Sequence, residues 1–275
     1  MKLRTVILSL LLSAGCLLTV QAQTMPEVEQ QINFYLEGIS YWRFQYAPED
    51  TSFGYEVSKE DSVNNINAAL FNYIKDVVAK VPGIIKHPPK LPENSDMKII
   101  TSPDKKVCVY SWEAHTISHS HSYNNVFVLA DGVVWGGNDS KVQKKQTSYS
   151  EVEAEIIEIM EVPYSNGGKI YLTVSKVSLS ENEVLKSLRA YTIDNKTFAG
   201  KTMFSKDGNQ FDSIEYIYDY MSNYDFEKMQ EINTIHLSKN KKKLYIPEVE
   251  NNQMTGKWQV YVFDGTNFFY DEKAK

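Results

Sequence analysis

The spacing of apolar residues predicts two helices near the start of the chain. Apolar side chains recur every three or four positions over residues 24–42, which is the pattern of one buried helix face. Thr24, with Glu27 three positions later, resembles a capping box, and Pro26 is suited to a first helical turn. The first helix is therefore expected to begin at residue 24 or 25. Its apolar stripe consists of Val28, Ile32, Tyr35, Leu36, Ile39 and Trp42.

A second helix is predicted by the same spacing over residues 63–81. Ser58 or Ser62 is suited to cap its start, and Pro82 with Gly83 is suited to end it. One apolar stripe on each helix is typical of helices that cover one face of a sheet. The stripe of the second helix consists of Val63, Ile66, Leu70, Tyr73, Ile74, Val77 and Val81.

From residue 97 onward the apolar residues alternate with polar ones, which predicts β-strands. Four Asp-Gly or Asn-Gly dipeptides follow or separate these runs, and such dipeptides favour type I′ hairpin turns with positive φ at both central residues. Residues 151–156 alternate like a half-exposed strand with a slip at Ile156–Ile157, although a helix also fits this stretch. The dipeptides are Asp131-Gly132, Asn166-Gly167, Asp207-Gly208 and Asp264-Gly265.

A turn that starts with serine and ends with lysine recurs before several of the predicted strands. Ser102–Lys106, Ser165–Lys169 and Ser238–Lys242 share this pattern, and Ser205–Gly208 is a partial copy. Their starts are separated by 63, 40 and 33 residues, whereas propeller blades repeat more evenly. We therefore expect an α+β fold with N-terminal helices packed on an irregular antiparallel β-meander domain. A propeller-like β domain is the alternative.

The first residues have the pattern of a secretory signal peptide. A positively charged start is followed by an apolar run over residues 6–20, and Val20 and Ala22 are the small residues expected at −3 and −1 before a cleavage point. Cleavage after Ala22 predicts an exported protein, periplasmic or extracellular. The alternative is lipidation at Cys16, within Ser13–Cys16, which would anchor the chain at the outer membrane; the apolar residues beyond Cys16 favour cleavage.

Proline positions divide the rest of the chain. Four of the nine prolines lie within residues 82–92, which is typical of a linker. The expected division is a signal peptide over residues 1–22, a helical segment over residues 23–92, and an antiparallel β domain over residues 93–275. No apolar run after residue 22 approaches the length of a transmembrane helix, so none is expected in the mature chain.

Composition and charge exclude several classes of protein. The chain is 42% hydrophobic and 23% charged, which are globular values that exclude disorder. Its net charge of −6 argues against a nucleic-acid partner, which requires a basic face. Removal of residues 1–22 leaves one cysteine, Cys108, within an apolar run, and a buried structural thiol is expected there.

The candidate chemistry is one histidine cluster. Three of the five histidines, His115, His119 and His121, lie within seven residues, two positions after Glu113. On an unbroken strand His119 and His121 would point to the same face, and imidazoles with a carboxylate can bind Zn²⁺ or Cu²⁺. The alternative is a solvated hairpin tip rich in serine and histidine, since a loop at residues 115–120 would interrupt the alternation.

A second candidate is the alternating row Tyr216, Tyr218 and Tyr220. Such a row forms either an aromatic ligand platform or cross-strand packing on a sheet face, and the second arrangement is more common. No Gly-x-Ser-x-Gly elbow and no His-Glu-x-x-His helix occurs, and no catalytic residue or cofactor is expected from a motif.

Two stretches resemble uncharacterised secreted proteins of Gram-negative bacteria. They are Lys106–Trp112, followed by a polar hairpin and Asn125-Val126, and the closing Trp258–Phe269. The resemblance implies N-terminal helices, a β-rich remainder and an envelope location, and it carries no catalytic residue. Those relatives have glycines in the hairpin where this chain has serine and histidine.

The functional expectation is an exported, non-enzymatic binding module whose partner is a protein or glycan of the cell envelope. The alternative is a metal-dependent protein, such as a hydrolase, that uses His115, His119 and His121 with Zn or Cu. A further alternative is an inhibitor or immunity-type protein, whose acidic surface would steer it toward a basic partner.

Overall fold

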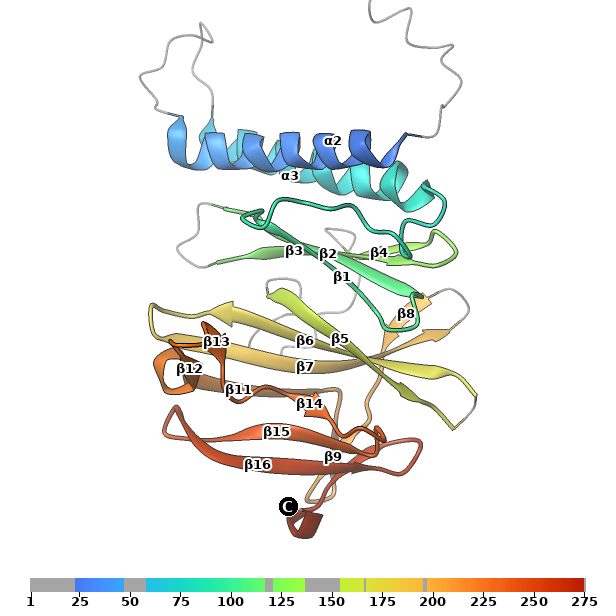
Figure 1. The fold of residues 1–275 in the computed structure, drawn as a ribbon, viewed down its shortest axis with the longest axis vertical. Helices are drawn as coiled ribbons and strands as arrows, with labels where there is room; N and C mark the ends of the chain where they lie inside the picture. The colour runs from blue at the N-terminus through green and yellow to red at the C-terminus, as the bar shows by residue number, and fades with distance from the viewer. Residues whose placement is uncertain are drawn as a thin grey trace, which may run out of the picture.

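The computed structural model describes residues 23–46, 58–116, 121–136, 154–165, 167–194 and 197–274. The predicted signal peptide and the lipidation site at Cys16 lie outside these residues. The described chain forms a column of four layers, one of helices and three of mostly antiparallel sheets (Figure 1). This arrangement confirms the α+β class. The sheets follow one another face to face, and the described residues form no closed ring of sheets.

The helical layer begins as the sequence predicts. The Thr24 backbone N–H donates to the Glu27 carboxylate at 2.8 Å, and Ser58 accepts a hydrogen bond from the Asp61 backbone N–H at 3.1 Å. The capping box and the Ser58 cap are therefore confirmed. The second α-helix ends before the expected Pro82–Gly83 stop and continues as a short 3₁₀ turn. The elements are α2 (Met25–Ser40), its π-helical continuation η2 (Tyr41–Gln45), α3 (Lys59–Asp76) and η4 (Val78–Lys80).

The first sheet is covered by the helices on one face. Cys108, Tyr110 and Trp112 alternate along one strand and join the buried residues of the two helices. Ile84 and Ile85, from the proline-rich segment, belong to the same cluster. The division of the chain at residue 92 stays a prediction. The strands are β1 (Met97–Thr101), β2 (Val107–Glu113), β3 (Tyr123–Leu129) and β4 (Val134–Gly136), in that order.

The second sheet packs against the opposite face of the first. Val107, Val109 and Phe127 contact side chains such as Tyr171 and Phe198 across this interface. The pairing of its first strand with the next shifts between Ile156 and Glu158, which confirms the predicted slip. The order is β11-β7-β6-β5, with β8 also on β7; the strands are β5 (Glu155–Pro163), β6 (Lys169–Ser178), β7 (Glu183–Asp194), β8 (Thr197–Gly200) and β11 (Ser213–Asp219).

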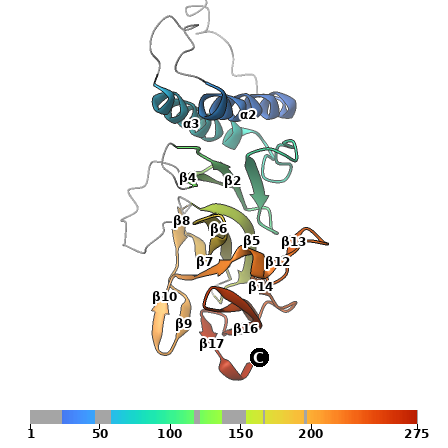
Figure 2. The ribbon, with the colours of Figure 1, turned by 90° about the vertical axis from the view of Figure 1, so that its left-hand side faces the viewer.

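The third sheet closes the column at its C-terminal end. Its inner face, which includes Leu244, Tyr261 and Phe268, packs on Leu172 and Leu188 of the second sheet. A two-stranded hairpin projects beside this interface (Figure 2). The third sheet has the order β10-β9-β17-β16-β15-β14 and the bounds β9 (Phe204–Lys206), β10 (Asn209–Phe211), β14 (His236–Leu237), β15 (Lys243–Glu250), β16 (Gln253–Phe263) and β17 (Phe268–Tyr270); the hairpin is β12 (Tyr224–Asp225) with β13 (Gln230–Glu231), and the 3₁₀ turns are η7 (Tyr220–Asn223) and η8 (Glu272–Ala274).

The recurrent serine turn has the same hydrogen bonds in two sheets. Ser102 Oγ accepts from the Lys106 and Val107 backbone N–H groups, and Ser238 Oγ accepts from the Lys243 backbone N–H at 2.9 Å. In each turn the serine hydroxyl also donates to the side chain two positions later, at 2.8 and 2.7 Å. The sequence repeat is thus a repeat of turn geometry at the start of a strand.

The type I′ prediction is correct at one of the Asp-Gly dipeptides and wrong at two others. Asp207 and Gly208 both have positive φ, whereas in Asp131-Gly132 and Asp264-Gly265 only the glycine does. Those two loops return the chain with a single left-handed residue, for which glycine is the least strained choice. Asn166 lies outside the described residues. A turn that we did not expect, Asn251-Asn252 between β15 and β16, has positive φ at both positions.

Candidate functional site

The histidine cluster lies at the end of β2. His115 has a left-handed backbone with φ 50°, which interrupts the strand alternation directly after Ala114. His121 Nδ1 lies 2.7 Å from Glu113 Oε1, and His115 Nδ1 lies 3.5 Å from the same atom. His115 Nε2 is 3.7 Å from Asp96 Oδ2. The structure therefore brings His115 and His121 to one carboxylate.

The metal hypothesis for this cluster stays a prediction. His119 lies outside the described residues, so the predicted set of His115, His119 and His121 is described only in part. Among the residues that are described, no group of three histidine, cysteine or acidic side chains is placed to hold a metal ion. Glu113 instead shares its Oε1 between the two histidines.

Cys108 is a buried free thiol, as the sequence predicts. Burial raises the pKa of this thiol to about 11, against a weaker opposing effect of its hydrogen bond with Thr101. A thiol with this pKa is almost entirely protonated at neutral pH, which is unfavourable for a nucleophile.

The tyrosine row is divided between two environments. Tyr216 and Tyr218 lie on β11 with ring centroids 5.8 Å apart, whereas Tyr220 begins the 3₁₀ turn η7. Tyr218 is fully buried and its hydroxyl donates to Glu231 at 3.2 Å. The row is therefore not a continuous exposed platform: Tyr216 packs against the cluster between the second and third sheets, and Tyr218 contacts Lys186 and Glu231.

A buried ion pair lies beside these tyrosines. The Lys186 ammonium group, whose side chain is 2% exposed, contacts the Glu231 carboxylate and lies 5.5 Å from the centroid of the Tyr218 ring. Burial lowers the pKa of Lys186, and the attraction of Glu231 opposes this shift. Since Glu231 is the last residue of β13, the pair attaches the projecting hairpin to β7.

The most unusual surface in the described chain is residues 220–232, which comprise η7, β12 and β13 and which we call the 220–232 segment. Four of the seven large apolar side chains that are exposed among the described residues lie within it. Its aromatic rings are in mutual contact, because the centroids of Tyr220 and Phe226 each lie 4.9 Å from that of Tyr224. The exposed side chains are Met221, Phe226, Met229 and Ile232, with exposed fractions between 57% and 72%.

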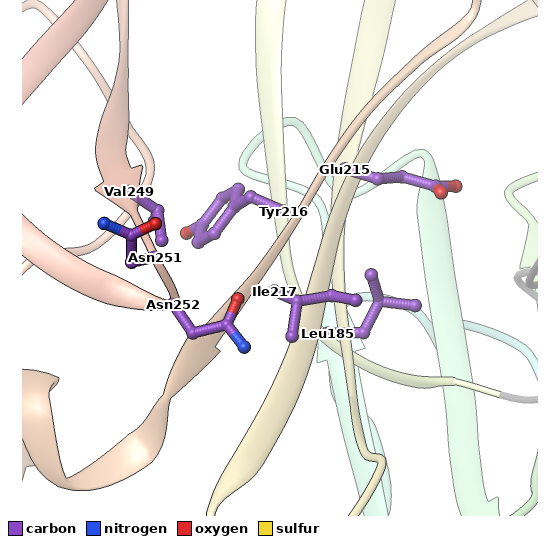
Figure 3. A pocket seen from close by; sticks show the side chains of 7 residues that line it. All are labelled: Leu185, Glu215, Tyr216, Ile217, Val249, Asn251 and Asn252. Atoms are coloured by element: carbon purple, nitrogen blue, oxygen red, sulfur yellow. The ribbon is translucent and has the colours of Figure 1, made fainter.

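A cleft of about 370 Å³ is lined in part by β11, the strand that directly precedes this segment in the chain. One wall is β11, and the other is the end of the β15–β16 hairpin (Figure 3). Tyr216 points toward Val249, while Glu215 points the opposite way (Figure 3). The walls are linked where the Asp219 backbone N–H donates to the Asn252 carbonyl at 2.6 Å. The cleft is lined by Leu185, Glu215, Tyr216, Ile217, Val249, Asn251 and Asn252.

The comparisons with known proteins found no match. No family description, no curated protein and no solved structure resembles this chain closely enough to assign a relative. Within the described residues, no helix is long and apolar enough to cross a membrane.

The sequence did not reveal the 220–232 segment or the cleft. Phe226, Met229 and Ile232 are too few to establish a helical or a strand period, and the intervening residues are charged or polar. The sequence signal that could have indicated an exposed surface was the presence of isolated apolar residues within a polar stretch. Their exposure depends on the position of the hairpin outside the three sheets, which a local pattern does not contain.

Proposed function

We propose that this chain is an exported, non-enzymatic binding protein, and that it holds a protein partner of the cell envelope with the 220–232 segment. The observation that carries the proposal is the concentration of exposed Met221, Phe226, Met229 and Ile232 on one short projection. Exposed apolar side chains concentrated in one segment are typical of interaction surfaces, where methionine and aromatic residues are enriched. The expectation of export rests on the pattern of residues 1–22.

The side chains of this surface favour a protein over a glycan. The hydroxyl groups of a sugar must find hydrogen-bond partners when they leave water, and an unpaired polar group is costly to bury. The four exposed side chains offer no strong donor or acceptor, whereas an apolar protein surface needs none.

The segment is also held firmly enough to present a defined surface. Asn223 Nδ2 donates to the Asn233 carbonyl at 3.0 Å, and the Asn233 backbone N–H donates to Asn223 Oδ1 at 2.8 Å, so the two ends of the hairpin are joined. Lys186 fixes its last strand through Glu231. A surface that is ordered before binding loses less conformational entropy on association.

The test is to replace Phe226 and Met229 with serine in the full chain and to crosslink it chemically in the cells that produce it. Covalently attached envelope proteins are quantified after purification. A matched control replaces Phe34 and Phe44, which are 65% exposed on α2 and η2, with serine. We expect the recovery of at least one attached protein to fall about tenfold in the hairpin variant only. Equal recovery from the wild-type chain and both variants would contradict the proposal.

A further inference from the structure

The strand β11 has one edge that no other strand of the described chain pairs with. It is the last strand in the order β11-β7-β6-β5, and its register with β7 runs from Ser213↔Arg189 to Asp219↔Glu183. An edge strand presents unpaired backbone N–H and C=O groups to its open side. Which residues present them follows from the hydrogen-bond pattern of the antiparallel pair.

Residues 215 and 217 direct their backbone groups to the open side. In an antiparallel pair, residues that exchange hydrogen bonds alternate with residues that do not. The Ala190 backbone N–H donates to the Asp212 carbonyl, which places the even-numbered positions of this strand in the bonded set. The backbone N–H and C=O groups of Glu215, Ile217 and Asp219 therefore point to the open side of β11. The bond from the Asp219 N–H to the Asn252 carbonyl is consistent with this direction.

The cleft runs along this open edge. Successive side chains of a strand point to opposite faces of its sheet, yet Glu215 and Tyr216 both line the cleft. A single cleft reaches both faces only if it passes around the edge of the strand. The residues of the cleft that face Tyr216 are Val249, from β15 of the third sheet, and Asn251, from the turn that follows β15 (Figure 3).

We propose that this cleft is a strand-addition site, at which an extended segment of the partner protein pairs with the outer edge of β11 through the backbone groups of Glu215 and Ile217. This inference rests on the proposed function and names the form of the partner. Backbone pairing supplies affinity in such complexes, and the pockets for alternate side chains supply specificity.

The lining of the cleft also indicates which side chains the partner's extended segment would carry. Tyr216 and Val249 offer apolar contacts on one face of β11, which favours apolar residues at the alternate positions of the added strand that point to this face. Glu215 is the one charged side chain of the lining, and burial raises its pKa although Arg189 partly opposes this. A basic side chain of the partner, at a position that points to the Glu215 face, would pair with this half-buried carboxylate. The chain's net charge of −6 favours the approach of a basic segment as well.

The probe is a pool of synthetic nine-residue peptides in which valine, isoleucine or phenylalanine alternates with lysine. The tightest member is titrated by fluorescence anisotropy against the purified chain from residue 23 onward. It is then remade with N-methyl groups at its even or at its odd positions. Because a paired strand uses the N–H groups of alternate residues, we expect one methylated series to bind more than about tenfold more weakly. The other series should bind within about twofold of the parent.

A variant of the protein tests the same edge from the other side. Ile217→Pro removes the outward N–H without removing a hydrogen bond to β7, and proline is tolerated on edge strands. The control Ile217→Val keeps the N–H and shortens the side chain. We expect the proline variant to bind the peptide more than about tenfold more weakly and the valine variant to bind within about threefold of wild type. Circular dichroism establishes that both variants are folded. The experiment with methylated peptides uses the wild-type chain and does not depend on the folding of a variant.

Three results would overturn the inference. The first is the absence of binding by any peptide of the pool, and the second is binding that is equally insensitive to both methylation patterns. The third is self-association of the chain that Ile217→Pro abolishes, because β11 would then pair with a second copy. If the serine variant of the hairpin loses its partner in cells while the peptides fail, the proposed function stands and strand addition falls. If the peptides pair with β11 while the hairpin variant keeps every partner, the strand-addition site stands and the proposed hairpin surface falls.

Discussion

Lys186 and Glu231 form a buried ion pair between β7 and β13, and this contact holds the exposed 220–232 segment against the second sheet. Tyr218 contacts both partners, since its hydroxyl donates to Glu231 and its ring lies under the Lys186 ammonium group. The register pairs Lys186 with Tyr216, which lines the cleft. The ion pair therefore connects the two surfaces that we propose for binding.

Replacement of Glu231 by glutamine leaves the Lys186 charge buried without its counter-ion. We expect the free energy of unfolding to fall by about 3 kcal/mol, because breaking one side of a buried pair leaves an uncompensated charge. Urea denaturation measures this change. The control is Asp225→Asn in the same hairpin, which weakens the exposed pair of Asp225 with Lys228 and should have a far smaller effect. Equal effects of the two variants would show that the Lys186 pair does not stabilise the hairpin.

Asn67 links the helical layer to the first sheet. Its side chain donates to the Val63 and Ala114 carbonyls, and it accepts from the Trp112 indole N–H at 2.8 Å. Asn67→Leu leaves the buried indole N–H without this partner, so we expect a loss of about 2 kcal/mol in the free energy of unfolding. The exposed Asn64 on the same helix provides the control Asn64→Leu. A loss of less than about 0.5 kcal/mol in Asn67→Leu would contradict this account.

The stability of the fold should fall in alkaline solution, in part through Cys108. Burial raises the pKa of its thiol from 9.0 to about 11, so between these values the folded state holds a proton that the unfolded state has lost. This contribution is fully present below pH 9 and is lost as the pH rises through 11. We expect Cys108→Ala to be less stable at pH 8, and its free energy of unfolding to fall less steeply between pH 9 and 11. Denaturant titrations at pH 8, 9, 10 and 11 measure the slope. Equal slopes would contradict the thiol's contribution, and Tyr73 and Tyr261, with pKa values of about 12, extend the fall to higher pH in both proteins.

The histidine cluster is tested by metal titration. Glu113 accepts from His121 and lies near His115, and within the described residues no three such side chains are placed to hold an ion. We therefore expect weak Zn²⁺ and Cu²⁺ binding that is equal in the wild-type chain and in the His115/His119/His121 triple-alanine variant. Calorimetry on residues 23–275 measures the affinity. Tight, stoichiometric binding that is lost in the variant would favour the metal-dependent alternative.

Local patterns were sufficient for the parts of the fold that local physics determines. The capping box at Thr24, the Ser58 cap and the slip after Ile156 were predicted because each depends on residues adjacent in the chain. The pairing of β17 with β9 was not predicted, because parallel pairing of distant segments leaves no periodic signal. The prediction of a type I′ turn at Asp131-Gly132 was wrong, because an Asp-Gly dipeptide fits more than one loop type.

The candidate site was not predicted from the sequence. The row Tyr216, Tyr218 and Tyr220 was identified as a candidate platform, but the sequence did not show that Glu231 reaches Tyr218 from a hairpin. Exposure of Phe226 and the open edge of β11 depend on which strands lie beside them, and strand order is a property of the whole chain. A binding surface that exists because no other strand covers it can therefore be identified only from the structure.

Photo-crosslinking establishes whether the 220–232 segment holds a protein partner. A photoreactive amino acid is placed at position 226 or, as the control, at position 34, in the full chain in the cells that produce it. Both positions carry exposed phenylalanines. We predict a discrete protein adduct from position 226 and none from position 34. No adduct from position 226, or the same adducts from both positions, would contradict the account.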